Sequence, residues 1–150
     1  MSRQPSFSPR DEMVDTMINL AHLSKSHRIV VAGADSIELY LALRRRGFAF
    51  GALASACRGP SGQHSAGLIT GDRCYQAIEA SINQISKRLY AAASIAISFE
   101  SQESGLGGKV RAKLQQGFRI EAGARCHQRF VLAAHREEFG QQFGAIANVA

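Results

Sequence analysis

The sequence has few cysteines and no long apolar run, and both absences narrow the class of protein. Its 150 residues include three cysteines, which lie far apart and form no C-x-x-C pair, so a disulfide framework is not expected. No uninterrupted apolar stretch is long enough to cross a bilayer, and the polar first ten residues lack the apolar core of a secretory signal. The sequence therefore predicts a cytoplasmic protein with reduced thiols and no membrane partner.

Internal repeats, low-complexity tracts and a linker between two kinds of composition are also absent. Hydrophobic residues make up 45% of the chain and charged residues 20%, which is ordinary for a globular protein of a size that closes one core. These features predict a single domain over residues 1–150, with residues 1–8 and 137–150 as tails.

The formal net charge is +6, and its densest run is Arg44, Arg45 and Arg46, followed by Gly47. Such a run is compatible with a nucleic-acid site, because lysine and arginine displace the counterions of phosphate. It also suits the last turn of a helix, where cations complement the negative end of the macrodipole. We favour the helix end, and binding of nucleic acid or an acidic partner remains an alternative.

The apolar pattern predicts alternating helices and strands. β-Branched runs without polar alternation, as in residues 28–32, are typical of strands buried on both faces, and apolar spacings of three and four indicate helices. The predicted helices are 9–23, 35–46, 74–89 and a short one ending at residue 116, and the predicted strands are 28–32, 48–54, 64–70, 94–99, 118–122 and 129–134. This order predicts an α/β fold, a Rossmann-like three-layer sandwich with a mostly parallel sheet and an antiparallel C-terminal edge hairpin.

Three segments carry a resemblance to a known family. Residues 28–35, R-I-V-V-A-G-A-D, are similar to the first strand and glycine turn of class I S-adenosylmethionine-dependent methyltransferases. Residues 114–118, L-Q-Q-G-F, and 129–134, R-F-V-L-A-A, resemble that family's late helix and its last two strands. The resemblance implies a Rossmann-like fold, with S-adenosylmethionine as the possible cofactor. Its contacts would fall on Gly33, Ala34, Asp35, Ser55 and Asp72.

The sequence departs from that family where the cofactor would bind. The first turn has one glycine where the family places two or three, and the segment after the second strand, residues 53–57, has no acid for the ribose hydroxyls. Only a short loop precedes His64, so part of the usual methyltransferase sheet is missing. Residues 91–93, A-A-A, replace the family's Gly-Gly turn before a later strand.

These departures predict a methyltransferase-like domain that has lost catalysis, binds no cofactor, and acts as a binding or oligomerisation module, most plausibly as a homo-oligomer. The predicted contacts are the helix that bears Met13 and Met17 and the tail with Phe139 and Phe143. The alternative is an active S-adenosylmethionine-dependent methyltransferase acting on a small substrate. Its pocket would be bounded by Gly33, Asp35, Ser55 and Asp72.

Other reactive side chains have plain structural interpretations. Asp35 and Glu38 follow the first strand, where open α/β sheets bind ligands, but helix capping explains both acids more simply. His64 and Asp72 flank the same predicted strand, eight positions apart, which is about 25 Å when extended and argues against a hydrogen-bonded dyad. Cys57 is a possible nucleophile beside Arg58, although a small residue at a strand end is the simpler interpretation. The spacing of the histidines predicts no metal site.

Overall fold

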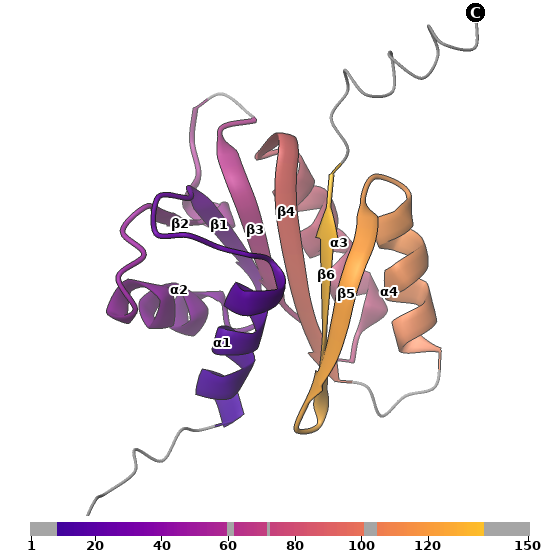
Figure 1. The fold of residues 1–150 in the computed structure, drawn as a ribbon. Helices are drawn as coiled ribbons and strands as arrows, with labels where there is room; N and C mark the ends of the chain where they lie inside the picture. The colour runs from indigo at the N-terminus through magenta and orange to yellow at the C-terminus, as the bar shows by residue number, and fades with distance from the viewer. Residues whose placement is uncertain (1–8, 60–61, 72, 101–104, 137–150) are drawn as a thin grey trace, which may run out of the picture.

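The computed structural model describes residues 9–59, 62–71, 73–100 and 105–136, which form three layers (Figure 1). The helices are α1 (Pro9–Leu20), α2 (Ser36–Arg45), α3 (Tyr75–Ser86) and α4 (Leu106–Gln115). The strands are β1 (Ile29–Gly33), β2 (Gly51–Leu53), β3 (His64–Thr70), β4 (Leu89–Glu100), β5 (Arg119–Cys126) and β6 (Arg129–His135), with a 3-10 turn η1 (Ala54–Ala56) after β2. None of the helices within these ranges is long and apolar enough to span a bilayer.

The six strands form one sheet in the order β2-β1-β3-β4-β6-β5. Strands β2, β1, β3 and β4 are parallel, whereas β6 runs antiparallel to both of its neighbours. The mostly parallel sheet with an antiparallel edge hairpin is therefore confirmed. Between β2 and β3 the described residues hold only η1, in agreement with the shortened sheet that the sequence predicts.

Each face of the sheet is covered by two helices, and this gives two cores. α1 and α2 pack on one face through the buried side chains Met13, Val14, Met17, Leu39 and Leu43. α3 and α4 pack on the other through Ile78, Ile82, Ile85, Val110 and Leu114. Side chains of β1 point alternately to the two faces of the sheet and contribute to both cores, as expected for a strand buried on both faces.

The two methionines of the helix predicted to self-associate cannot make that contact themselves, because they belong to the core. Met13 is 6% exposed and Met17 is 0% exposed, since both face the sheet from α1. A side chain buried within its own chain has no surface to offer a second copy. Phe139 and Phe143, the other predicted contacts, lie outside the described residues.

Several predicted boundaries differ from the structure. β2 is shorter than the predicted strand 48–54, because Phe48 is buried under α2 before the strand begins and residue 54 already belongs to η1. β4 is longer, since Leu89 pairs with His64 of β3. Residues 91–93 are therefore strand, and the prediction of a turn there is wrong. β5 likewise continues to Cys126, so its hairpin with β6 closes through two residues only.

Two arginines of the run at the end of α2 contact other side chains of the protein. Arg46 donates to Asp15 at 2.8 Å, to Asp11 at 3.3 Å and to the carbonyl of Ala42 at 3.1 Å. Burial alone would lower the pKa of Arg46, but the hydrogen bonds to the two aspartates outweigh it and raise that pKa. Arg44 lies 5.9 Å from the ring centre of Tyr40. Arg46 thus ties α1 to α2.

Candidate functional site

A pocket of about 600 Å³ lies at the carboxyl ends of the parallel strands, within the usual size range of small-ligand sites. The first turn of α1 borders it on one side and the β5–β6 hairpin on the other. We call it the carboxyl-end pocket, and its lining residues are Pro9, Arg10, Met13, Asp35, Thr70, Glu100, Cys126, His127, Gln128 and Arg129. This is the end of an open α/β sheet at which ligands bind.

The turn after β1 is bonded to β3 rather than open. Gly33 has a φ of +112°, and an added Cβ would overlap the carbonyl oxygen of Thr70, so only glycine fits there. Ala34 donates its backbone N–H to that carbonyl at 2.9 Å, and Asp35 donates its N–H to the Thr70 hydroxyl at 3.2 Å. The single glycine therefore allows β1 and β3 to approach closely, and the two following amides are already used.

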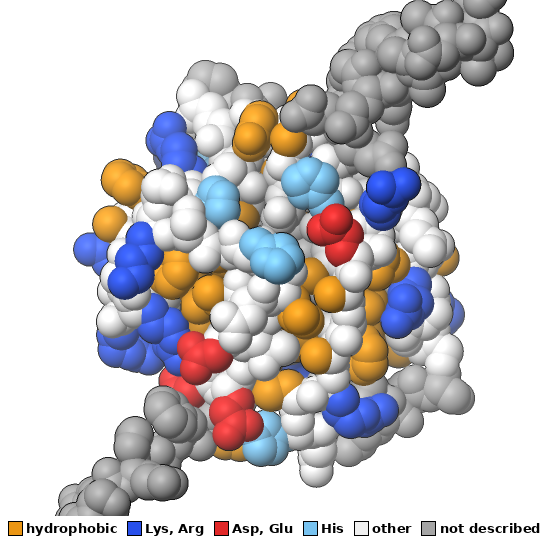
Figure 2. Space-filling model, viewed as in Figure 1, with side chains coloured by type: hydrophobic (Ala, Val, Ile, Leu, Met, Phe, Trp, Pro, Cys, Tyr) orange, Lys and Arg blue, Asp and Glu red, His pale blue; other side chains and the backbone are white. Residues whose placement is uncertain are grey.

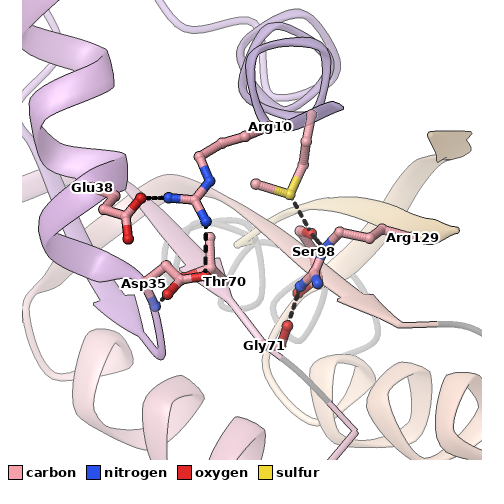
Figure 3. Close-up of polar contacts among 8 residues, drawn as sticks. Arg10, Asp35, Glu38, Thr70, Gly71, Ser98 and Arg129 are labelled. Atoms are coloured by element: carbon pink, nitrogen blue, oxygen red, sulfur yellow. Dashed lines mark hydrogen bonds and ion pairs between the residues drawn. The ribbon is translucent and has the colours of Figure 1, made fainter. Parts of the chain in front are cut away.

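Asp35 stands at the N-cap position of α2 but makes no capping hydrogen bond with its side chain. Its backbone (φ −112°, ψ 38°) is outside the extended region that capping residues usually adopt. The carboxylate instead accepts a hydrogen bond from Arg10 at 3.4 Å, and Arg10 also forms an ion pair with Glu38 (Figure 3). The predicted capping interaction is wrong, and both acids bind a cation from the first turn of α1.

The floor of the pocket is a hydrogen-bond network around Ser98, which is 0% exposed. Arg129 donates to the Ser98 hydroxyl at 2.7 Å and to the carbonyls of Ser98 and Gly71, while that hydroxyl donates to the sulfur of Met13 at 2.7 Å (Figure 3). The network joins β3, β4, β6 and α1. It fixes Arg129 at the base of the pocket, although α4 and β5 separate residue 129 from residue 98 in the sequence.

A carboxylate, a thiol and an imidazole meet on the hairpin side of the pocket. Glu12 comes from α1, Cys126 ends β5 and His127 begins the hairpin turn, and one ligand atom from each lies within 4.8 Å of the others. Nε2 of His127 contacts the Glu12 carboxylate. Figure 2 shows acidic side chains and a histidine gathered at this end of the molecule, beside the start of α1. Histidine spacing could not reveal this group, because Glu12 is at the other end of the chain.

The predicted cofactor contacts are distributed over different places. Asp35 lines the carboxyl-end pocket, whereas Gly33 and Ala34 line a second hollow of about 460 Å³ beside α3. Ser55 lies exposed in η1 and lines neither of these two. Asp72 is outside the described residues. Of the predicted cofactor contacts that the structure describes, only Asp35 lines the same cavity as Arg10 and Arg129.

Cys57 is half-buried against the α3/α4 core, and its carbonyl accepts a hydrogen bond from Arg88 at 3.1 Å. Cys57 follows η1 and does not end a strand, so the predicted position is wrong, although its packing suits a structural residue.

Comparison with solved structures places the fold. Neither a family model nor a curated protein sequence matches the chain. A precorrin-6y C5,15-methyltransferase from Geobacter metallireducens GS-15 is similar with a TM-score of 0.59 and 11% identity, over 91% of this chain and 94% of that one. A ribosomal protein L11 methylase from Lactobacillus delbrueckii subsp. bulgaricus has a TM-score of 0.56 and 15% identity, over 92% and 91%.

A SAM-dependent O-methyltransferase from Thermotoga maritima is similar with a TM-score of 0.56 and 13% identity, over 91% of this chain and 68% of that one. The chain therefore has the Rossmann-like fold of SAM-dependent methyltransferases. At such identities the likeness concerns the fold, as the same fold supports many activities.

Proposed function

We propose that this domain uses the methyltransferase fold to bind a small ligand carrying both signs of charge in the carboxyl-end pocket, without transferring a methyl group. The observation that carries the proposal is the turn after β1. Nucleotide-binding turns present free backbone N–H groups to the ligand, whereas here the amides of Ala34 and Asp35 are bonded to Thr70.

The end of β2 supports the same proposal. In a nucleotide site of this fold an acid at that position holds the ribose hydroxyls. Here the chain turns into η1 (Ala54–Ala56), which contains no carboxylate and leaves Ser55 exposed. The loss of the acid and the use of the turn amides affect the same cofactor, so they support loss of nucleotide binding together.

The charges of the carboxyl-end pocket indicate what it would take instead. Arg10 lies with Asp35 on one wall, and Arg129 lies near the end of β4, where Glu100 pairs with Arg73 at 2.9 Å. A ligand of one charge would displace one partner of the Arg10–Asp35 pair and leave the other uncompensated in a half-enclosed site, which is costly. A small zwitterion, such as a free amino acid, offers a partner to each sign.

The test is calorimetric titration and thermal shift of the purified protein with the twenty free amino acids, S-adenosylmethionine and S-adenosylhomocysteine. We expect saturable binding of at least one amino acid and no binding of S-adenosylmethionine or S-adenosylhomocysteine. Asp35→Asn should weaken that binding about tenfold, which corresponds to one charged hydrogen bond. Glu121→Gln, at an exposed acid on β5 outside the pocket, is the matched control and should leave the affinity unchanged.

Two results would contradict the proposal. Saturable binding of S-adenosylhomocysteine that Asp35→Ala weakens would establish an active nucleotide site and favour a methyltransferase acting on a small substrate. If none of the twenty amino acids binds, the proposal of a zwitterionic ligand is wrong.

We also propose that the domain self-associates through its β2 side. β2 is an edge strand, Phe50 just before it is 57% exposed, and α2 beside it exposes Ile37 at 62%. An open edge next to exposed apolar side chains is a surface that a second copy can cover. Sedimentation velocity at micromolar concentrations should show a dimer for the natural chain and a monomer for Phe50→Ser. A monomer in both cases would exclude it.

A further inference from the structure

The thiol, imidazole and carboxylate at the hairpin side of the pocket form a set of metal donors. Cys126, His127 and Glu12 contribute a sulfur, a nitrogen and an oxygen, all within 4.8 Å of one another. We propose that these three residues bind a zinc-like transition-metal ion at the rim of the carboxyl-end pocket. The inference does not depend on the zwitterionic ligand proposed above, because it rests on a different group of side chains.

The backbone holds two of the donors in place. Cys126 is the last paired residue of β5, opposite Arg129 of β6, and its side chain is 8% exposed. His127 follows with a φ of 58°, a left-handed conformation that few residues other than glycine adopt and that is found at functional sites. The hairpin thus presents a buried sulfur and an adjacent imidazole toward the first turn of α1.

The third donor approaches from that turn. The side chains of Glu12 and His127 are about half exposed, at 49% and 47%, and they already contact each other. Zinc bonds of about 2.0 to 2.3 Å place tetrahedral donors roughly 3.3 to 3.8 Å apart. The donors lie up to 4.8 Å apart, so the farthest must approach by up to about 1 Å. Glu12 and His127, which are already in contact, must separate to admit the ion. Both side chains are partly exposed and can make these movements by rotation without moving the strand.

The choice of donors favours a borderline metal over a hard one. Magnesium and calcium select oxygen ligands, whereas thiolate and imidazole favour zinc and similar ions. The charges also suit a divalent ion, because one thiolate and one carboxylate neutralise it. Thr16 on α1 donates its hydroxyl to the backbone carbonyl of Glu12 at 2.8 Å and lies 3.9 Å from the sulfur of Cys126, so it packs between two of the donor residues.

A simple ion pair explains only part of this arrangement. It accounts for Glu12 and His127, but not for a thiol within reach of both. Three protein ligands leave a fourth tetrahedral position, as in zinc sites that hold a water or a substrate atom. Because Cys126 and His127 also line the carboxyl-end pocket, a bound ion would border that cavity.

The experiment uses cobalt(II) as a spectroscopic probe and zinc as its competitor, with the protein kept reduced. We expect one cobalt per chain, a near-ultraviolet band from thiolate-to-cobalt charge transfer, and displacement by zinc. Cys126→Ser should abolish the band, whereas Cys74→Ser, at an exposed cysteine away from the group, should retain it. Circular dichroism without metal checks that both variants are folded.

Two exposed positions keep the test decisive if Cys126→Ser fails to fold. His127→Asn keeps a residue that tolerates the left-handed backbone, and Glu12→Gln keeps the shape of the side chain. Each variant should raise the cobalt dissociation constant at least about tenfold, as is typical when the surroundings of a metal site are altered. The proposal is overturned if cobalt gives no thiolate band, or if these variants bind it as tightly as the natural chain.

Discussion

The cationic side chains at the two ends of the sheet have different kinds of hydrogen-bond partner. At the amino ends of the parallel strands, two arginines bond to backbone carbonyls. Arg136 donates to Leu89 at 3.0 Å and to Ser86 at 3.1 Å, and Arg88 donates to Gly59 at 3.3 Å. A carbonyl within the main chain cannot change partner without disturbing the fold, so this end is locked.

At the carboxyl ends, cations mostly meet side-chain carboxylates. Arg10 pairs with Asp35 and Glu38, and His127 contacts Glu12. Arg129 is the exception, since it bonds to two carbonyls and forms the floor of the pocket. Exposed carboxylates can exchange one cation for another, which is what ligand or metal binding requires. The comparison therefore agrees with the proposal that ligands bind at the carboxyl end, and it predicts that the arginines of the amino end contribute more to stability.

The largest effect should come from a glycine at the carboxyl end. Gly33→Ala places a methyl group into the Thr70 carbonyl in a left-handed backbone, and we expect a loss of about 3 kcal/mol or more in the free energy of unfolding. Gly59→Ala is the matched control, because Gly59 has a similar φ of +97° but nothing within 4 Å. It should lose only about 1 to 2 kcal/mol. Equal losses in urea denaturation would show that crowding by β3 is unimportant.

A smaller effect should separate the arginines of the two ends. Arg136→Met removes two hydrogen bonds from a charged group to carbonyls and a guanidinium 5.0 Å from the ring centre of Phe118, so we expect a loss of about 2 kcal/mol. Arg10→Met breaks a partly exposed ion pair and should cost at most about 1 kcal/mol. If Arg10→Met proved the more destabilising in urea denaturation, the contrast between the two ends would be reversed.

The smallest effect concerns pH at the amino end. Burial lowers the pKa of His64 below its ordinary value of 6.5, and the charges of Arg28 and Arg88 lower it further, against a hydrogen bond to the Arg88 backbone. The unfolded chain therefore takes up the proton first as the pH falls below about 6.5, so stability decreases on acidification. Thermal unfolding from pH 7 to pH 5 should show a shallower decrease for His64→Gln than for the natural chain. An identical decrease would mean that His64 does not titrate between these values.

The sequence predicts the order of elements well because that order depends on local patterns. The run at residues 28–32 and the spacing of Ile78, Ile82 and Ile85 each report burial within one element. The start of β4 is different, since Leu89 becomes strand by pairing with His64. Alanines such as those at 91–93 carry little strand preference of their own. Their conformation is therefore decided by the neighbouring strand.

The candidate site is less predictable, since its interactions are far apart in the chain. The contact of Glu12 with His127 spans 115 residues, and Arg129 reaches Ser98 across 31. Asp35 shows the same limit: the sequence suggests a helix cap, but a cation 25 residues earlier takes the carboxylate. The positions of Asp35 and Glu38 after the first strand did indicate the carboxyl end of the sheet.

The meeting of α1 with β5 and β6 has a consequence for the folding order. The pocket takes walls from the first and the last described elements, so it cannot exist while the chain is still being synthesised up to residue 129. Contacts of such long sequence separation form late, after the entropy of closing a long loop has been overcome. Before the β5–β6 hairpin has formed, Met13, Val14 and Met17 of α1 cannot yet pack against β6, so part of their burial is missing. Ligand or metal occupancy would therefore report that the whole domain has been completed.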